Sequence, residues 1–403
     1  MSTSLLYHAF AIRGYQYVNT KYQNSAVHFT IQQEKGELCC PVCKSRRVIR
    51  RGVVHRMFRS VPIGRKLVYI RLGVQRVLCK ACGMLRQVKI PFAPERRSYT
   101  RQFARYALEL SRHMTIKDVA RHLQVSWDVI KDIQKSFLGR RYARPKLKQL
   151  QQIAIDEIAV SKGHRYLTLV LDLERGNVVY VGEGKGAQAL NPFWERLKRS
   201  KARIKAVATD MSPAYIQAVV QNLPGAVLVF DRFHIMKLFN DKLSDLRRQV
   251  YHEATLMEKP VIKGTRWLLL KNAENLDPRR REAERLEEAL RLNQPLATAY
   301  YLKEDLRQLW EQPDKETAAA FLQDWMARAH ASGVGMLQKM ATTLGLYRSG
   351  ILAYYDYPIS TGPLEGTNNK IKTMKRQAYG FRDQEFFKLK ILAIHEAKYA
   401  LVG

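Results

Sequence analysis

The sequence predicts a multidomain protein of the mixed α/β class. Three observations lead to this prediction: short alternating runs with paired cysteines at the start, a helical stretch after them, and strand-like runs that then alternate with helical ones. A chain of 403 residues is long enough for about two to four domains, each with a buried core. We therefore expect small N-terminal modules followed by a larger layered domain.

The charge balance is strongly basic. Lysine and arginine together number 69, against 36 aspartates and glutamates, so the formal net charge is +33. Nucleic acid is the usual partner of such a chain, and an anionic membrane surface is the alternative. Apolar residues make up 46% of the chain and the charges are spread along it, which predicts a folded protein rather than a disordered one.

The distribution of apolar residues indicates the cellular compartment of the protein. No apolar run approaches about 18 residues, so we expect no membrane span. Residues 1–10 lack the basic start and long apolar stretch of a signal peptide, which predicts a cytoplasmic protein. In that reducing compartment, five cysteines with four in close pairs indicate a metal site rather than disulfides.

Residues 1–92 read as short strands separated by turns. Two Cys-x-x-Cys pairs lie among them: Cys40, Cys43, Cys79 and Cys82. Four thiolates on two turns suit tetrahedral Zn²⁺, and this zinc would be structural because four thiolates leave no open position. The alternative is two unrelated pairs, one of them redox-active. Cys39 could also replace Cys40 as a ligand. We predict a zinc-binding β-rich domain.

Residues 93–148 change to helical periodicity and end in a basic linker. Three helices are expected, at 101–112, 115–123 and 126–138. The short break at Gln124 between the last two is typical of a helix-turn-helix, although the usual glycine of that turn is missing. An ordinary helical hairpin is the alternative, and the surrounding charge favours DNA binding. The residues expected to contact DNA are Trp127, Lys131, Lys135, Arg140 and Arg141.

Strand-like and helical runs alternate from residue 149 to residue 250. The order is β-β-β-α-β-α-β, and short turns between the first three strands predict antiparallel pairing. The strands are expected at 152–158, 165–172, 177–182, 204–210 and 226–230. Residues 251–355 show helical periodicity alone. Two last helices are expected at 363–376 and 384–399.

Three carboxylates stand in informative settings. Asp156 lies inside an apolar strand, Asp210 ends another, and Glu365 begins a late helix. A carboxylate within an apolar strand is costly unless it is used, and three of them together could hold two divalent ions such as Mg²⁺. Helix capping is the alternative for Asp210, and a first-turn acid favoured by the helix dipole is the alternative for Glu365. The nearest competing acids are Glu157 and Asp172.

Asp231 and His234 follow the last strand directly. An acid and a histidine three residues apart can flank a metal, hold a phosphate or move a proton. A capping aspartate and a partly buried histidine would leave the same spacing, so the pattern alone supports both interpretations equally.

Three tryptophans lie in the basic helical stretch, at Trp267, Trp310 and Trp325. Aromatic rings in such a setting can stack on an unpaired base. Packing in a helical core is the more common role of any one of them.

Several segments together resemble one family. They are Ile153-Ala-Ile-Asp-Glu157, Thr209-Asp-Met-Ser-Pro-Ala-Tyr215, Phe230-Asp-Arg-Phe-His-Ile235, Gly362-Pro-Leu-Glu-Gly-Thr-Asn-Asn-Lys-Ile-Lys372 and Arg376-Gln-Ala-Tyr-Gly-Phe-Arg382. This set resembles the bacterial insertion-sequence transposases of the ISL type, which are DDE transposases. The resemblance extends over nearly the whole chain, and residues 360–382 are its most specific part.

The resemblance implies a fold and its boundaries. The fold is a multidomain α/β protein with an N-terminal zinc ribbon, a helix-turn-helix, and a ribonuclease H-like core interrupted by an all-α insertion. The expected boundaries are 1–92 for the zinc domain, 93–148 for the helix-turn-helix with its linker, 149–250 for the first part of the core, 251–355 for the insertion, and 356–403 for the C-terminal helices of the core.

The resemblance also assigns the site residues. Asp156, Asp210 and Glu365 would be the catalytic triad that binds Mg²⁺ or Mn²⁺. Asp231 and His234 match the acid-x-x-His signature of these transposases, and are expected to be catalytic. Further DNA contacts are expected from three residues of the late helix, Asn368, Lys372 and Arg376. Two threonines that depart from the family pattern, Thr361 and Thr367, are expected to lie away from the chemistry.

The implied function is DNA transposition. The protein would bind the terminal inverted repeats of its element and target DNA, as a homodimer on DNA, in the bacterial cytoplasm at the nucleoid. It would then cleave a strand and join the free 3′-hydroxyl to the target in a metal-dependent reaction. Two alternatives remain: a catalytically inactive DNA-binding regulator, and a structure-selective ribonuclease H-like nuclease.

Overall fold

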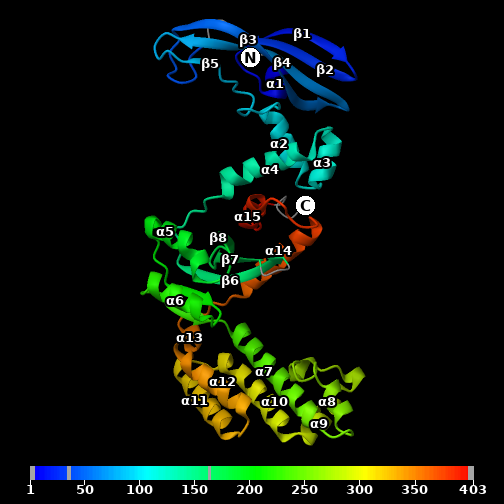
Figure 1. Cartoon of the computed structure of the whole chain (residues 1–403), viewed down its shortest axis with the longest axis vertical. Coiled ribbons are helices and arrows are strands. Elements are labelled where there is room, and N and C mark those ends of the chain that lie inside the picture. The colour runs from blue at the N-terminus through cyan, green and yellow to red at the C-terminus, as the bar shows by residue number, and fades with distance from the viewer. Residues whose placement is uncertain (1–4, 34–37, 162–164, 398–403) are drawn as a thin grey trace. The chain divides into compact units, whose positions relative to one another are not determined.

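A computed structural model describes residues 5–33, 38–161 and 165–397 (Figure 1). The chain divides into two compact units. The N-terminal unit comprises residues 1–141 with 377–380 and 397–403, and the C-terminal unit comprises residues 142–376 with 381–396. Within the described ranges, no helix is long and apolar enough to cross a membrane.

The N-terminal unit begins with a five-stranded sheet (Figure 1). A short helix, α1 (Leu5–Phe10), precedes strands β1 (Tyr15–Gln23), β2 (Ala26–Gln33), β3 (Val48–Ile63), β4 (Lys66–Cys79) and β5 (Leu85–Gln87). The order is β1-β2-β4-β3, with β5 also paired to β4. Val68, Ile70 and Leu72 of β4 are buried at every second position, as expected for a strand with one face on a core. This confirms the predicted β-rich start.

Three helices follow in the same unit: α2 (Arg101–Leu110), α3 (Ile116–Leu123) and α4 (Trp127–Tyr142). Thr100 and Thr115 cap the first two, because their side chains accept a hydrogen bond from a first-turn N–H. Gln124 closes α3 in the left-handed conformation at φ 52°, and Val125 N–H bonds Ala120 O at 3.0 Å. A glutamine therefore does here what glycine usually does in this turn.

Arg59 joins the sheet to the helix pair. The side chain is 6% exposed and donates to Leu123 O at the end of α3 over 3.0 Å and to Val68 O over 3.4 Å. Burial lowers the pKa of this guanidinium. The cation sits where the helix dipole is negative, which stabilises it there. The sheet and the helix-turn-helix are therefore packed on each other.

The C-terminal unit is built on a second five-stranded sheet. Its strands are β6 (Gln152–Ser161), β7 (Arg165–Asp172), β8 (Asn177–Glu183), β9 (Ala206–Thr209) and β10 (Val227–Phe230). The order is β10-β9-β6-β7-β8. The first three strands in the chain pair antiparallel, and β9 and β10 continue the sheet in parallel. This is the ribonuclease H-like arrangement that the motifs implied.

Helices cover both faces of this sheet (Figure 1). One face packs on α5 (Asn191–Ser200) and α6 (Pro213–Asn222), and the other on α14 (Gly362–Gln377) and α15 (Gln384–Leu392). Ala154 and Ile158 belong to the α14 face, whereas Ile153 and Ile155 belong to the α5 face. Because side chains alternate along a strand, Asp156 points to the α14 face.

Between β10 and α14 the chain is helical. The helices are α7 (Arg232–Glu253), α8 (Lys259–Gly264), α9 (Glu282–Leu292), α10 (Gln294–Arg307), α11 (Lys315–Ala331), α12 (Gly335–Leu346) and α13 (Arg348–Leu352). Short 3-10 helices occur in this stretch at Ala273–Asn275, Pro278–Arg280, Gln308–Glu311 and Ala353–Tyr355, and a further one, Ala187–Leu190, precedes α5. Helices α7 and α9 to α13 contribute to one apolar core, so the all-α insertion is confirmed.

The end of the chain differs from the prediction. The last helix was expected at 384–399, but α15 ends at Leu392, and residues 393–396 form turns. Residues 398 and 399 lie outside the described residues.

Candidate active site

Two of the expected acids come together at neighbouring strand ends. β6 and β9 run parallel with Ala154 opposite Ala208, so the same register brings Asp156 and Asp210 side by side. Burial raises the pKa of the Asp156 carboxyl, and the nearby negative charges of Asp210 and Glu157 raise it further. The charge of His234 acts in the opposite direction. The negative charges of two adjacent carboxylates repel each other, and a bound cation would offset this repulsion.

The competing acids have other tasks. Glu157 points to the α5 face, where it accepts a hydrogen bond from Tyr215 Oη at 3.1 Å. Asp172 is 2% exposed and its Oδ1 accepts the N–H groups of Glu174 and Arg175, which closes the β7–β8 turn. Neither of these carboxylates lies on the face of the sheet that packs on α14. Asp156 is therefore the acid of β6 that faces α14, the helix that carries Glu365.

Glu365 is exposed in the first turn of α14. One turn further along the same helix, Asn368 Nδ2 donates to Asp156 Oδ2 at 2.9 Å. Residues three apart share a helix face, so this bond holds the Glu365 face of α14 toward β6. Within the described ranges, the three acids do not form a group that could hold a metal ion by itself. The structure thus pairs the two aspartates and brings the helix of Glu365 against them.

Asn368 is one of the residues expected to contact DNA. It is 6% exposed and its amide nitrogen donates to Asp156. Its Oδ1 is buried without a hydrogen-bond partner, which is costly unless a ligand uses it. A carbonyl oxygen beside a carboxylate pair is a donor set that suits Mg²⁺. Lys372 and Arg376, on later turns of α14, are exposed.

Asp231 is one of the residues expected to be catalytic. Its carboxylate is 3% exposed: Oδ1 accepts Phe233 N–H at 3.1 Å, and Oδ2 accepts the N–H and the hydroxyl of Thr361. This carboxylate caps α7 and joins it to the turn that precedes α14. Thr361 was expected to lie away from the chemistry, yet its carbonyl accepts the Leu364 and Glu365 N–H groups that begin α14.

The remaining two residues of this region are His234 and Thr367. His234 is partly buried in the first turn of α7, and it is close enough to Asp156 to lower the pKa of the Asp156 carboxyl. Thr367 bonds His395 at 3.0 Å, a contact between α14 and the last turns of the chain. No local signal in the sequence reveals the Asp231–Thr361 or Asn368–Asp156 pairs, because their partners are 130 and 212 residues apart.

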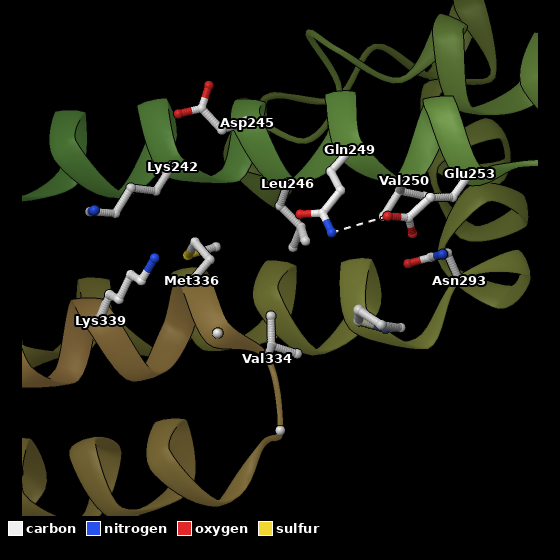
Figure 2. Close-up of a pocket in the computed structure, with 13 residues that line it drawn as sticks. Lys242, Asp245, Leu246, Gln249, Val250, Glu253, Asn293, Val334, Met336 and Lys339 are labelled. Carbon is white, nitrogen blue, oxygen red and sulfur yellow. Dashed lines mark hydrogen bonds between the residues drawn. The ribbon is translucent and has the colours of Figure 1, made fainter.

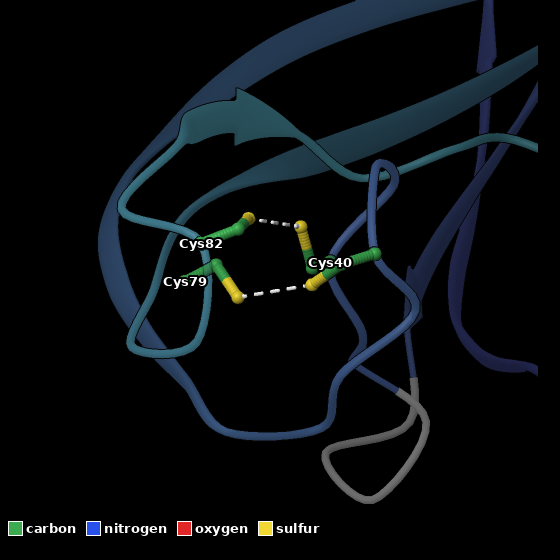
Figure 3. Close-up of side chains that lie close together, drawn as sticks. Cys40, Cys79 and Cys82 are labelled. Carbon is green, nitrogen blue, oxygen red and sulfur yellow. Dashed lines mark hydrogen bonds between the residues drawn. The ribbon is translucent and has the colours of Figure 1, made fainter.

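The four paired cysteines form a compact cluster in the N-terminal unit (Figure 3). Their sulfurs all lie within 4.8 Å of one another, with Cys40–Cys82 at 3.7 Å and Cys43–Cys79 at 3.5 Å. Zn–S bonds of about 2.3 Å in a tetrahedron place two sulfurs about 3.8 Å apart. The N–H of Cys43 lowers the pKa of the Cys40 thiol, whereas the neighbouring sulfurs help to raise that of Cys82. Cys39 lies outside this cluster.

The residues expected to contact DNA in the helix-turn-helix lie along α4. Trp127 is 46% exposed, and Lys131 Nζ lies 5.3 Å from its ring centroid. Arg140 and Arg141 are exposed near the end of the helix, and Lys135 is partly buried. Ile130 is fully buried and anchors α4 in the helical core.

Comparison with known proteins decides the family. Residues 153–391 match a family model described as Transposase, of the ISL3 type. Residues 88–138 match the helix-turn-helix domain of transposase family ISL3. The first match spans more than half of the chain. The chain belongs to the ISL3 transposase family. The family expected from the motifs is therefore confirmed, and the helix-turn-helix match supports DNA as a partner.

Two similar transposases cover most of the chain. The transposase for insertion sequence element IS1001 of Bordetella parapertussis is 35% identical over 361 residues, 88% of each chain. The transposase for insertion sequence element IS1557 of Mycobacterium tuberculosis is 26% identical over 360 residues, 83% of this chain and 80% of that one. A chain of the Drosophila P element transposase strand transfer complex overlaps 76% of this chain and 94% of its own, with 10% identity and a TM-score of 0.39.

The cavity drawn in Figure 2 lies in the insertion, away from these acids. It has a volume of about 510 Å³, and Lys242 of α7 and Lys339 of α12 face each other across it. Gln249 donates to Glu253 at 3.1 Å beside it. None of the residues predicted for catalysis lines this cavity. The candidate active site is therefore the strand edge that carries Asp156 and Asp210, not this cavity.

Proposed function

We propose that this ISL3 chain is a DDE transposase that binds the terminal inverted repeats of its element, cleaves a strand there and joins it to target DNA. The observation that carries the proposal is the pairing of Asp156 and Asp210 on adjacent parallel strands, with α14 bonded to Asp156. The reaction would take place on nucleoid DNA in the bacterial cytoplasm. Two element ends must meet, so the chain would act as a homodimer on DNA.

Asp156, Asp210 and Glu365 would hold Mg²⁺ or Mn²⁺, with the free Oδ1 of Asn368 as a further oxygen donor. Two such ions activate the attacking hydroxyl or water and stabilise the leaving oxygen. His234 lies beside Asp156 and would position the scissile phosphate. Exposed Lys372 and Arg376 would hold the strand by contacts that weaken with salt.

Recognition of the ends would belong to the N-terminal unit. Zn²⁺ on the four cysteines would keep the sheet folded, and α4 would enter the major groove with Trp127 and Lys131 toward the bases. Arg59 holds α3 on the sheet, so the two modules would present one rigid surface to the DNA.

The test is an assay of strand cleavage and joining on a labelled duplex that carries the element's own end, with Mg²⁺ and with EDTA. Metal-dependent nicking at the end followed by a joined product supports the transposase. Tight, specific binding without cleavage under Mg²⁺ or Mn²⁺ would support the DNA-binding regulator instead. Cleavage without joining, whatever the end sequence, would support the nuclease.

Substitution of Thr361 tests whether its hydrogen bond to Asp231 helps to position Glu365. Valine has the same shape as threonine but cannot donate a hydroxyl hydrogen bond to the buried Asp231 carboxylate. We expect Thr361→Val to weaken Mn²⁺ binding by about 10-fold or more, as loss of a supporting contact behind a metal ligand typically does. Electron paramagnetic resonance of Mn²⁺ measures this without relying on activity.

The matched control is Thr361→Ser, which keeps the hydroxyl and is expected to bind Mn²⁺ as the wild type does. Binding of the duplex end should be unchanged in both variants. A Thr361→Val protein with wild-type Mn²⁺ affinity would contradict the role given to this pair, and so would equal weakening in Thr361→Ser.

A further inference from the structure

The three tryptophans of the insertion have different surroundings. Trp325 is fully buried and donates its Nε1–H to Leu302 O at 2.8 Å, and Trp310 is 7% exposed. Both pack in the helical core. Trp267 is 64% exposed. Tryptophan is highly buried on average, so Trp267 differs in its surroundings from the other two.

Trp267 is held on an anchored turn. Thr265, Leu268 and Leu269 around it are 1%, 3% and 1% exposed. Thr265 Oγ1 donates to Ile262 O at 2.7 Å, and Leu269 N–H bonds Thr265 O at 3.0 Å. The backbone under the exposed ring is therefore fixed by buried neighbours. A ring presented in this way loses little conformational entropy when a partner stacks on it.

One arginine lies against this ring, and two more lie on α7. Arg266 Cζ lies 4.7 Å from the Trp267 ring centroid, and Arg247 and Arg248 lie on α7. Burial lowers the pKa of Arg247, and the positive charges of Arg266 and Arg248 lower it further, so the three guanidinium groups are near one another. The Nε of Arg247 is buried without a hydrogen-bond partner. Arg248 itself forms an ion pair with Asp245.

We propose that this surface, formed by Trp267, Arg247, Arg248 and Arg266, binds one unpaired nucleotide of a DNA strand. The base would stack on Trp267, and its phosphate would accept from the arginines. A nucleotide supplies both parts, a planar ring and an anion, at the spacing of neighbouring side chains. An apolar protein segment would bring no anion to the positive charges of Arg247 and Arg266. The inference rests on the proposed function, since it assumes DNA with unpaired nucleotides near the element end.

The test compares two duplexes with the element's end sequence, one blunt and one with a two-nucleotide 3′ overhang, bound by the full-length protein. We expect the wild type to prefer the overhang and Trp267→Ala to lose about 10-fold in affinity for the overhang alone, the size of one stacked base. Trp267→Phe keeps an aromatic ring and should keep most of the preference. Tyr301→Ala removes another exposed aromatic ring of the insertion and should change nothing.

The phosphate contact has its own measurement. Arg266→Gln should make the salt dependence of overhang binding shallower by about 0.7 in the slope of log affinity against log salt, the value for one released counterion on a single strand. An unchanged slope would overturn this contact.

Equal wild-type affinity for both duplexes would overturn the proposal, and so would an equal loss on both in Trp267→Ala. Cleavage of the same duplexes separates this failure from failure of the proposed function. If the wild type cleaves its end but binds both duplexes equally, only the proposed nucleotide site is overturned. If the wild type does not cleave, the proposed transposase function is overturned.

Discussion

Asp156→Asn is expected to abolish cleavage and joining at the element end, by at least about 1,000-fold, or roughly 4 kcal/mol of transition-state stabilisation. Asparagine keeps the shape of the side chain but removes the charge that a divalent ion requires. It also still accepts from Glu157 N–H, so the strand should stay in place. The measurement is the product yield on labelled duplex with Mg²⁺, together with affinity for the end.

The matched control is the next residue in the same strand. Glu157→Gln removes an equal charge on the opposite face of the sheet, where the glutamine oxygen can still accept from Tyr215 Oη. We expect this variant to cleave within about threefold of the wild type, a change of less than 1 kcal/mol. Equal losses in the two variants would mean that Asp156 supports the sheet rather than the chemistry. Lost end binding in Asp156→Asn would lead to the same conclusion.

Cys79→Ser is expected to remove the structural metal and to destabilise the N-terminal unit. Cys79 is 1% exposed and ends β4, the strand that pairs with three others, so loss of its metal bond would loosen both the cluster and the sheet edge. We expect zinc content to fall to background and the melting temperature of this unit to drop by about 10 °C or more. Metal analysis and calorimetry measure the two effects.

Cys39→Ser is the control, because Cys39 is adjacent to the cluster but outside it. It should keep one zinc per chain and wild-type melting. Binding to the element end should fall in Cys79→Ser and stay unchanged in Cys39→Ser, since the helix-turn-helix packs on this sheet through Arg59. Zinc retained in Cys79→Ser, or lost in Cys39→Ser, would show that the ligand set is different.

Local patterns were sufficient for several parts of the protein. The alternation of apolar residues predicts the β-rich start of the chain, since one buried face forces a period of two. Short apolar runs predict the strands of the second sheet. The Cys-x-x-Cys pairs predict the cluster, because each pair needs only a local turn. Asp156 stands out by itself as an acid in an apolar strand. The family-typical segments around Asp210, His234 and Glu365 led from these elements to the transposase family.

Only the tertiary structure decided which side chains share a face or a partner. Asp156 and Glu157 are neighbours in sequence, but the pleat sends one toward α14 and the other toward Tyr215. Asp231 has the spacing expected of a catalytic residue. In the fold its carboxylate accepts hydrogen bonds from Thr361, which follows it by 130 residues, after the insertion.

Trp267 and Trp325 look alike in sequence and differ in exposure, 64% against 0%. The physical reason is common to all three cases. Backbone periodicity is local and can be recognised along the chain, whereas burial, charge coupling and hydrogen-bond partners depend on segments that meet only after folding.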